Sequence, residues 1–516
     1  MNSFIETMKN FGETENGAIA YNSTCNALLD AFGSLGAMKD SPEEDIINIF
    51  SKAYDENPDY AMKLLFYMRD IREGQGMRRV FRICCHWLAY THRDALCRNL
   101  QYISEYGRWD DLINLFYNQP DVRDEAGKII LNQLKVDTIA ARDGGNVSLL
   151  GKWMPSNNAS SKTTKNMARM LTTYLHMTPK LYRKTLAYLR KHIDVVECKM
   201  SGNEWDKINY PTVPSHASSN YVNAFWKHDA NNYQKYLLDV AMGKATINAG
   251  ALFPADIVHK YFNTIGDSVV RAAVADAQWK ALPNYLGDSI ETGICVVDTS
   301  GSMNGRPLEV ALSLGLYCAD KCRGPFKNHF ITFSRRPQLQ EIVGDTFIDK
   351  LKNMYRTEWN MNTDIEAVFD LILMTAKNSR CKPEDMPKKL YIISDMQFDQ
   401  ARTGDYDYFS GKPIYKAPFM QTMKQKFKDA GYEMPALIYW NVRQSNCAMF
   451  HDTFDGEDCC FVSGYSPVLF KNILEGTEYI EVTNADGTKE IKQKIDPMNV
   501  MMTTLNSERY APIMAY

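Results

Sequence analysis

Three oxygen-bearing side chains stand at alternate positions in the stretch Asp298-Thr299-Ser300-Gly301-Ser302. The preceding residues 294–297 are all apolar, and such a run predicts a strand that is buried on both faces. Carboxylate and hydroxyl oxygens are ligands of hard cations such as Mg²⁺. The pattern D-x-S-x-S alone is weak, because at average composition it occurs by chance in about one chain in ten of this length. The alternative interpretation is a serine-rich turn that caps the following helix.

Two further oxygen-bearing residues take matching positions later in the chain. Asp395 ends a second apolar run at residues 390–393, as Asp298 ends the first. Thr363 precedes a helical pattern over residues 364–376. Parallel strands end at one edge of a sheet, where open α/β sheets bind ligands. Thr363 also opens the sequence Thr-Asp-Ile-Glu, a capping box that would explain this threonine without a metal.

No catalytic motif accompanies these residues. The chain has no G-x-x-x-x-G-K-[ST] loop, no G-x-S-x-G elbow and no H-E-x-x-H helix. The Asp298 turn also lacks the second aspartate of a phosphotransferase D-x-D. We therefore expect a protein that is not an enzyme and binds no nucleotide cofactor.

Strands and helices alternate from residue 289 onward, which predicts a doubly wound, mostly parallel α/β sheet in a domain of residues 286–475. A hairpin and a last helix follow in residues 476–516 and should pack back on the rest. The expected strands are 294–297, 329–333, 338–343 (paired with 329–333 around Arg335), 390–393, 436–440 and 459–462, then the hairpin 479–482 and 490–494 around a turn at 484–487. The expected helices are 307–322, 364–376, 419–429 and 496–505.

A helical-repeat domain is expected over residues 1–285, with a loop-rich stretch in residues 1–40 and helical patterns from there to about 285. Ser41-Pro42 and Asn57-Pro58 combine an N-cap with a proline in the first helical turn. The links are short, so neighbouring helices should pack antiparallel, and no strict repeat period is present. An irregular helical-repeat array, open or closed into a ring, is expected. Two helices should begin at these signals, and further helices are expected at 77–89, 108–117 and 126–139.

Residues 151–200 concentrate positive charge, with ten Lys and Arg against two acidic residues in a chain of net charge -3. A polar loop at 151–158 should be non-helical, and a long helix should run from Thr178 to about Met200, with an apolar stripe from Tyr182 to Val196. Basic side chains off that stripe could follow a phosphate backbone. The alternative is a solvated helix face, which an Arg190–Asp194 pair would support. The candidate RNA contacts are Lys152, Lys162, Lys165, Arg169, Lys180, Arg183, Lys184, Arg190 and Lys191.

Residues 201–250 are rich in aromatic side chains, which suit either base stacking or helix packing. Packing is the favoured interpretation. The side chains concerned are Trp205, Tyr210, Tyr221, Phe225, Trp226, Tyr233 and Tyr236.

The composition is that of a globular protein, with 45% hydrophobic and 23% charged residues. Twelve cysteines are scattered without a C-x-x-C pair, which favours reduced core cysteines over zinc or disulfides. No signal peptide opens the chain and no apolar run has transmembrane length. We expect a soluble protein of the cytoplasm or, if a virus encodes it, of the host cytoplasm or the virion.

The Asp-Ser-Ser turn, the loop threonine and the strand-end aspartate, in that order on a doubly wound sheet, resemble the metal-ion-dependent adhesion site of von Willebrand factor A domains. The resemblance implies a bound Mg²⁺ or Mn²⁺, with one coordination position left for a partner's carboxylate. The ligands that it implies are Asp298, Ser300, Ser302, Thr363 and Asp395.

The whole chain resembles the Ro autoantigen (TROVE) proteins, in which a ring of HEAT-like helical repeats carries a von Willebrand A-like domain and binds RNA. It is most similar to a sister family known only as a domain of unknown function, from viruses and plants. The stretches that carry the resemblance are residues 107–112, 148–156, 182–197, 359–364, 394–398 and 439–441.

This resemblance implies a non-catalytic RNA-binding scaffold that binds single-stranded or structured RNA and holds a protein partner at its metal site. The alternative is a protein–protein adaptor, or a virion-associated structural protein, that uses the metal site without RNA.

Overall fold

The structure of this chain is a computed structural model. It describes residues 10–14, 19–263, 268–287, 292–333, 336–356, 363–398, 419–443, 458–483 and 489–516. Arg335, the expected turn at 484–487 and residues 359–362 lie outside the described residues.

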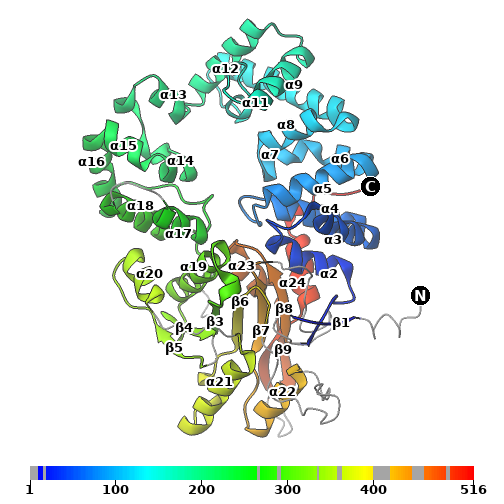
Figure 1. The fold of residues 1–516 in the computed structure, drawn as a ribbon, viewed down its shortest axis with the longest axis vertical. Helices are drawn as coiled ribbons and strands as arrows, with labels where there is room; N and C mark the ends of the chain where they lie inside the picture. Colours follow the sequence, from blue (N-terminus) through cyan, green and yellow to red (C-terminus); the bar gives the residue numbers. More distant parts are fainter. Residues whose placement is uncertain are drawn as a thin grey trace. The chain divides into compact units, whose positions relative to one another are not determined.

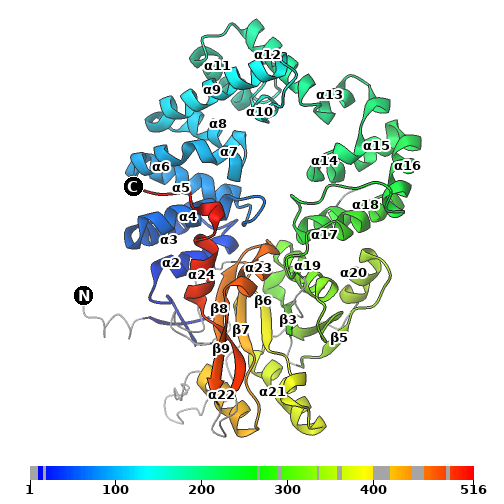
Figure 2. The same cartoon turned by 180° about the vertical axis from the view of Figure 1, so that it is seen from behind.

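The chain forms two compact units (Figures 1 and 2). The α/β unit consists of Met1–Pro42, Leu252–Ile265 and Gln278–Ser507, and the helical unit of Glu43–Ala251, Gly266–Ala277 and Glu508–Tyr516. This division differs from the expected boundaries at residues 285 and 475. The chain leaves the helical unit after Ala251 and returns to it twice, at Gly266–Ala277 and at Glu508–Tyr516.

A six-stranded sheet forms the centre of the α/β unit, in the order β5-β4-β3-β6-β7-β8 (Figure 1). All neighbours are parallel except β5, which pairs antiparallel with β4. Strands β3, β6, β7 and β8 are buried along their whole length, as their continuous apolar runs predict. The strands are β3 (Gly293–Asp298), β4 (His329–Phe333), β5 (Leu339–Glu341), β6 (Lys389–Ser394), β7 (Ala436–Asn441) and β8 (Cys459–Ser463).

The strand order contains one reversal of direction. From β3 the chain proceeds outward to β4 and β5, and it then returns to β6 and proceeds the other way to β7 and β8. Such a topological switch point, here between β3 and β6, is where open α/β sheets bind ligands beyond the carboxyl ends of their strands. The doubly wound, mostly parallel sheet expected from the sequence is confirmed.

The other elements of the α/β unit cover this sheet or extend from it. Three helices of this unit, at residues 27–34, 347–355 and 468–475, were not expected from the sequence; Thr346 caps the second of them by accepting a hydrogen bond from the Asp349 amide (3.1 Å). The helices are α2 (Ala27–Ser34), α17 (Pro254–Asn263), α19 (Arg306–Lys321), α20 (Phe347–Tyr355), α21 (Ile365–Ser379), α22 (Phe419–Asp429), α23 (Val468–Glu475) and α24 (Pro497–Leu505). Two hairpins are formed by β1 (Phe11–Glu13) with β2 (Ile19–Tyr21) and by β9 (Thr477–Thr483) with β10 (Lys489–Ile495).

The N-terminal helix α2 belongs to the α/β unit. The residues at its C-terminal end pack on the edge strand β8. The Gly36 amide donates to Ser463 Oγ (3.0 Å), and Ser463 Oγ in turn donates to the Phe32 carbonyl (3.3 Å). A Cβ added at Gly36 would lie 2.2 Å from the Ser463 carbonyl oxygen, so only glycine permits this approach.

The helical unit is a repeat array in which helices that follow one another along the chain pack together (Figure 2). Its helices are α3 (Glu43–Glu56), α4 (Pro58–Arg69), α5 (Arg78–Thr91), α6 (Arg93–Asn99), α7 (Ile103–Tyr106), α8 (Trp109–Asn118), α9 (Arg123–Arg142), α10 (Leu150–Trp153), α11 (Lys162–Tyr174), α12 (Pro179–His192), α13 (Val196–Ser201), α14 (Ser215–Asn220), α15 (Val222–His228), α16 (Ala230–Ala241) and most of α18 (Ser268–Lys280). The irregular helical array expected from the sequence is confirmed.

Local signals located the starts of α4 and α12 correctly, but two other boundaries were misplaced. Asn57 and Thr178 cap α4 and α12 as predicted. The long helix expected up to residue 200 is wrong, because Asp194 adopts a left-handed conformation (φ +60°) that ends α12. The loop expected at 151–158 is also partly wrong, since α10 extends to Trp153.

The C-terminal residues pack on the helical unit through a buried carboxylate. Asp70 is fully buried and accepts hydrogen bonds from the Arg509 guanidinium and from the Tyr510 hydroxyl (3.1 Å). Further along, the Ala515 amide donates to Asp59 (2.6 Å), and the Asn99 side chain donates to the Met514 carbonyl (2.6 Å).

Candidate metal site and basic surface

The carboxyl ends of β3 and β6 bring two aspartates together. Asp298 is the last residue of β3 and Asp395 follows β6, and these strands are adjacent and parallel, with Val297 opposite Ile393. Both aspartates are buried, with exposed fractions of 0% and 3%. The sequence separation of these carboxylates is large, so the sheet topology alone accounts for their proximity.

Hydrogen bonds orient the Asp298 carboxylate. The Ser300 amide donates to Oδ1 (2.8 Å), and the Ser394 hydroxyl donates to Oδ2 (2.5 Å). The Ser300 and Ser302 hydroxyl oxygens lie 3.0 Å apart. The turn therefore presents one carboxylate and two hydroxyls in one place.

Electrostatics at this point favour a bound cation. Burial and the negative charge of Asp395 raise the pKa of Asp298 to about 7. Two buried carboxylates that share a site destabilise each other's charged form, and a divalent cation between them removes that penalty. The donor chemistry fits Mg²⁺ or Mn²⁺, which take oxygen ligands and keep several waters.

Hydroxyl groups are needed to complete such a site. Within the described ranges, no three His, Cys, Asp or Glu side chains gather as a metal centre would require. A metal at Asp298 and Asp395 would therefore depend on Ser300, Ser302 and Thr363 and on water.

Thr363 lies beside the turn that follows Asp395. Thr363 is buried, with an exposed fraction of 1%. Its hydroxyl donates to the Gln397 carbonyl (2.8 Å), and the Gln397 amide donates to Asp395 Oδ1 (3.3 Å). The capping interpretation of Thr363 is wrong, because Asp364 is the N-cap of α21 and accepts from the Ala367 amide (2.9 Å).

Two residues at this site were not singled out from the sequence. Ser394, which holds the Asp298 carboxylate, was visible as the residue before Asp395 in the apolar strand. Arg443 follows β7 and donates from its guanidinium to the Ser302 carbonyl. No local signal marks Arg443, because its contact joins residues 141 positions apart.

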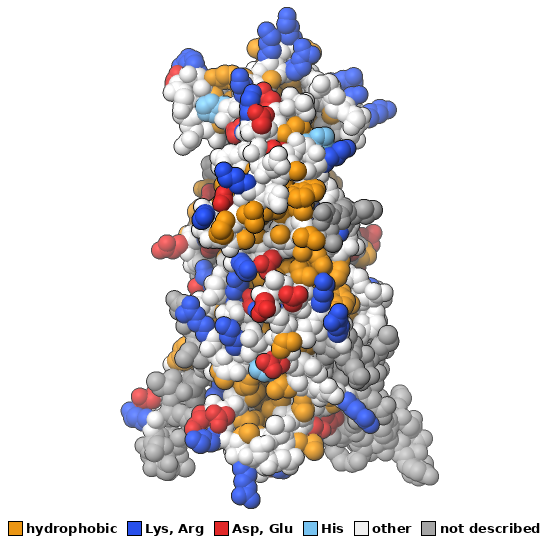
Figure 3. Space-filling view, turned by 90° about the vertical axis from the view of Figure 1, so that its left-hand side faces the viewer, with side chains coloured by type: hydrophobic (Ala, Val, Ile, Leu, Met, Phe, Trp, Pro, Cys, Tyr) orange, Lys and Arg blue, Asp and Glu red, His pale blue; other side chains and the backbone are white. Residues whose placement is uncertain are grey.

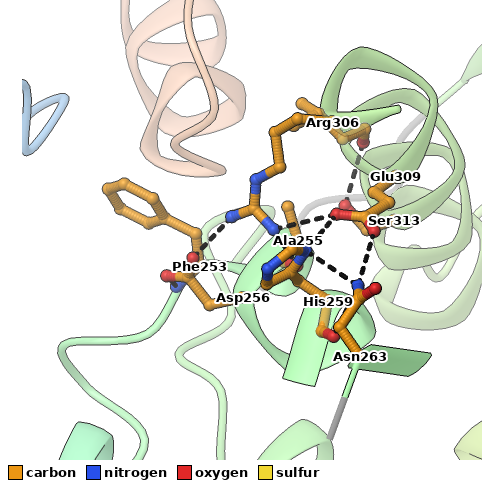
Figure 4. A network of polar contacts seen from close by, with 9 residues as sticks. Phe253, Ala255, Asp256, His259, Asn263, Arg306, Glu309 and Ser313 are labelled. Atoms are coloured by element: carbon orange, nitrogen blue, oxygen red, sulfur yellow. Dashed lines mark hydrogen bonds and ion pairs between the residues drawn. The ribbon is translucent and has the colours of Figure 1, made fainter. Parts of the chain in front are cut away.

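A polar network fixes the start of α19, which follows the metal-site turn (Figure 4). Arg306 donates to the Ala255 carbonyl (2.9 Å) and to Asp256 Oδ1 (2.6 Å), both on α17. Glu309 accepts from Arg306 (3.1 Å) and contacts His259 Nδ1 (2.8 Å). The hydrogen bonds of Arg306 thus anchor the C-terminal end of the serine turn on α17.

The helical unit carries the predicted basic surface on α11 and α12. Lys162, Arg169, Lys180, Arg183, Lys184 and Lys191 are exposed, and Lys165 is half-buried. Figure 3 shows Lys and Arg side chains gathered at the end of the view where Figure 1 places these helices. In the part of the chain that the structure describes, none of these seven side chains forms an ion pair. We call these seven residues the basic surface.

Arg190 does not belong to the basic surface. Its guanidinium donates to the Gly151 carbonyl (2.9 Å), the Met154 carbonyl (2.7 Å) and Ser156 Oγ (2.8 Å), so it holds the 151–156 segment. The expected Arg190–Asp194 pair is replaced by a pair between Asp194 and Lys199 (2.8 Å). Lys152 lies on that segment, with Nζ 5.9 Å from the centre of the Trp153 ring.

The aromatic residues of 201–250 pack rather than form an exposed stacking platform. Tyr210, Phe225, Tyr233 and Tyr236 are buried in one hydrophobic core. Trp205, Tyr221 and Trp226 are partly buried against it. Burial raises the pKa of Tyr236 to about 12. The favoured packing interpretation is confirmed.

Most cysteines of the described part are buried. Burial raises the pKa of Cys84 and Cys460 well above the usual range of a thiol. No helix among the described residues is long and apolar enough to span a membrane.

Comparison with known proteins assigns both halves of the chain to families of undetermined role. The domain of unknown function DUF2828 matches residues 14–129 and 127–290, and the domain of unknown function DUF7788 matches residues 292–505. The uncharacterized protein L728 of Acanthamoeba polyphaga mimivirus is 30% identical over 509 residues, which span 92% of this chain and 86% of that protein.

Among solved structures, the Ro (RSR) protein of Deinococcus radiodurans is similar over 94% of this chain and 100% of its own, with 12% identity and a TM-score of 0.37. Similarity at this level carries no conclusion about function. The two family matches and the viral relative agree with the expected sister family. The chain belongs to the DUF2828 family of proteins and carries a DUF7788 domain in its second half.

Proposed function

We propose that this protein is a non-catalytic RNA-binding scaffold. Its basic surface binds the phosphates of single-stranded or structured RNA. Its metal site binds Mg²⁺ or Mn²⁺ together with a carboxylate of a protein partner. The observation that supports RNA binding is the seven unpaired cations on two neighbouring helices.

The charge around the basic surface is one-sided. Between Asp143 and Asp194 the chain contains no acidic residue and nine Lys and Arg. Some other exposed cations of the helical unit have acidic partners, as Lys128 has in Asp124 and Arg142 in Asp143. Unpaired cations on a protein of net charge -3 concentrate the positive field in one place, which is the electrostatic signature of a polyanion-binding surface.

The metal site supports the second part of the proposal. A divalent ion there would supply a positive charge and an open coordination position for a carboxylate oxygen. The protein residues orient the ligands: Ser394 fixes Asp298, and Arg443 places a second positive charge next to Ser302. Such a site suits an acidic side chain of a partner protein.

Filter binding with a single-stranded RNA tests the RNA proposal. Changing Lys162, Lys165, Arg169, Arg183 and Lys184 together to Glu should abolish binding at low salt. The control changes Lys52, Arg98, Lys128, Lys135 and Arg142 to Glu; these are exposed cations on other helices of the same unit, and the net charge change is identical. Equal losses in both variants, or no affinity of the folded wild type, would refute the proposal.

The metal site also favours a second candidate function, a protein–protein adaptor without RNA. A protein that bound no RNA but showed Asp298-dependent stabilisation by Mg²⁺ would support this alternative.

A further inference from the structure

Four arginines of the helical unit surround two carboxylates at the start of α8. Arg69 and Asp111 are both fully buried and paired, with Arg69 Nη2 2.6 Å from Asp111 Oδ2. Arg82 donates to Asp111 (2.8 Å) and to Asp110 (3.1 Å). The two carboxylates are thus already shared by two arginines.

Of the other two arginines, Arg78 shares Asp110 with Arg82 through a long ion pair, and Arg108 has no ion pair among the described residues. Arg78 lies 3.7 Å from Asp110 and is 41% exposed. The Arg108 guanidinium forms no ion pair there and instead lies over the Trp153 ring, 4.9 Å from its centre. Lys152 adds a further cation on the same ring. The cluster therefore carries more positive than negative charge.

The surrounding structure is built to hold this arrangement. A Cβ added at Gly107 would lie 2.7 Å from Asp111 Oδ2 and 2.9 Å from Arg69 Nε, so the chain passes tightly over the buried pair. Arg190 fixes the segment that carries Lys152 and Trp153 through its three hydrogen bonds to residues 151–156. The Arg190 side chain is a positioning group for this segment.

Electrostatics agree with an uncompensated cluster. Burial lowers the pKa of Arg108, and the positive charge of Arg78 lowers it further. Burial likewise lowers the pKa of Arg69, although Asp111 opposes this change. A group with two or more negative oxygens would relieve the repulsion, and guanidinium groups bind phosphate oxygens in bidentate pairs.

We infer that Arg78, Arg108, Lys152 and Trp153 form a binding site for a phosphate group. The phosphate comes from an RNA chain if the proposed function holds, and from a free phosphate compound otherwise. The site lies outside the basic surface, and Arg190 joins the two by linking α12 to the Trp153 segment. It would therefore fix one phosphate at a defined position, whereas the exposed lysines contact the backbone without defined positions.

Tryptophan fluorescence measures this binding because Trp153 lies against Arg108. Titration with inorganic phosphate should give a saturable change that sodium chloride at equal ionic strength does not give. Trp153→Phe should remove the change. Arg108→Gln and Arg78→Gln should each weaken the apparent affinity at least tenfold, whereas Arg79→Gln, an exposed neighbour on α5, should leave it intact. Circular dichroism and thermal melting establish that each variant is folded, and Arg108→Lys, which keeps the charge, should retain part of the response.

A second titration distinguishes this inference from the proposed function. A short single-stranded RNA should give the same Trp153-dependent change and compete with phosphate. If the wild type responds to phosphate but not to RNA, the site stands and the RNA function fails. No saturable phosphate response in the wild type, or a response unchanged by Arg108→Gln, would overturn the inference.

Discussion

At the scale of single residues, the buried charges of this protein fall into two kinds. Asp111 and Asp70 are paired with arginines and serve the structure. Asp298 and Asp395 are buried beside each other and are held by hydroxyl and amide donors. Two buried carboxylates beside each other are costly in a purely structural role and useful in a cation site.

Removal of the Asp298 carboxylate should abolish metal-dependent stabilisation. Mg²⁺ that binds only the native state stabilises it by about 2.7 kcal/mol at a hundredfold excess over the dissociation constant, which is an upward shift of a few degrees in Tm. Asp298→Ala should melt at the same temperature with Mg²⁺ and with EDTA. Asp385→Ala, an exposed aspartate of the same unit, should keep the full shift. An Asp298→Ala variant that still responds to Mg²⁺ would contradict the metal assignment.

Loss of the Asp111 carboxylate should destabilise the helical unit strongly. Asp111→Ala leaves the Arg69 guanidinium buried without its partner, and such a change costs about 3–5 kcal/mol. Urea unfolding followed by circular dichroism measures this difference. Asp121→Ala, an exposed aspartate of the same unit, should change the free energy of unfolding by less than about 0.5 kcal/mol. A small effect of Asp111→Ala would mean that Arg69 finds water or another acceptor.

The residues of the candidate metal site were largely visible in the sequence because each stands at a local signal. Asp298 and Asp395 end apolar runs, and the serines follow at alternate positions. The contribution of Arg443 and the structural role of Arg190 were not visible. Both guanidinium groups bind carbonyl oxygens of distant segments, and a carbonyl is present at every residue, so no side-chain pattern marks the partner.

At the scale of elements, the sheet was predicted more accurately than the helices. Strands β3, β6 and β7 are buried on both faces, which forces continuous apolar runs that few other structures produce. Helix α12 was overextended, because the apolar stripe continues through Ile193 into α13 and the left-handed Asp194 breaks only the backbone. A periodic pattern of apolar residues shows which face of a helix is buried. It does not show where the helix ends if the next helix buries the same face.

The contact between α17 and α19 should tune the metal site. Arg306→Ala removes three hydrogen bonds that hold the first turn of α19, directly after the metal-site turn. We expect the Mg²⁺ affinity to fall several-fold while some metal-dependent stabilisation remains, as Mg²⁺ titrations followed by thermal melting would measure. Arg356→Ala, an exposed arginine of the same unit, is the control. An unchanged affinity in Arg306→Ala would show that the turn is ordered without α17.

At the scale of the whole molecule, the assignment of residues to the two units was not predictable from the sequence. The last residues of the chain belong to the helical unit, and the first 42 residues of the chain belong to the α/β unit. These placements depend on single long-range contacts, such as Gly36 with Ser463 and Asp70 with Arg509. Local propensity cannot indicate which of many compatible surfaces a terminal segment will cover.

The C-terminal residues should stabilise the helical unit. Arg509→Ala leaves the fully buried Asp70 with only Tyr510 as its partner in the C-terminal segment, and loss of one member of a buried pair costs about 3–5 kcal/mol. The transition of the helical unit in a thermal melt should therefore move to lower temperature, and the Mg²⁺-dependent shift should persist. Glu508→Ala, an exposed neighbour, should have little effect. Loss of the Mg²⁺ response in Arg509→Ala would contradict independent roles for the two units.

If the basic surface binds RNA, the affinity should fall as the salt concentration rises. The steepness of this fall should be proportional to the number of phosphates that the surface contacts. Each neutralised phosphate of a single strand contributes about -0.7 to the slope of the logarithm of affinity against the logarithm of salt concentration, so seven contacts give a slope of about -5. Changing Lys162 and Lys184 to Gln should make the slope less steep by about 1.4 and weaken binding equally for RNAs of different sequence. Changing Lys52 and Lys135 to Gln should leave the slope unaltered, because these exposed lysines lie on α3 and α9. A slope near zero in the wild type would mean that the phosphates contribute little, and that the seven unpaired cations on α11 and α12 serve another polyanion or none.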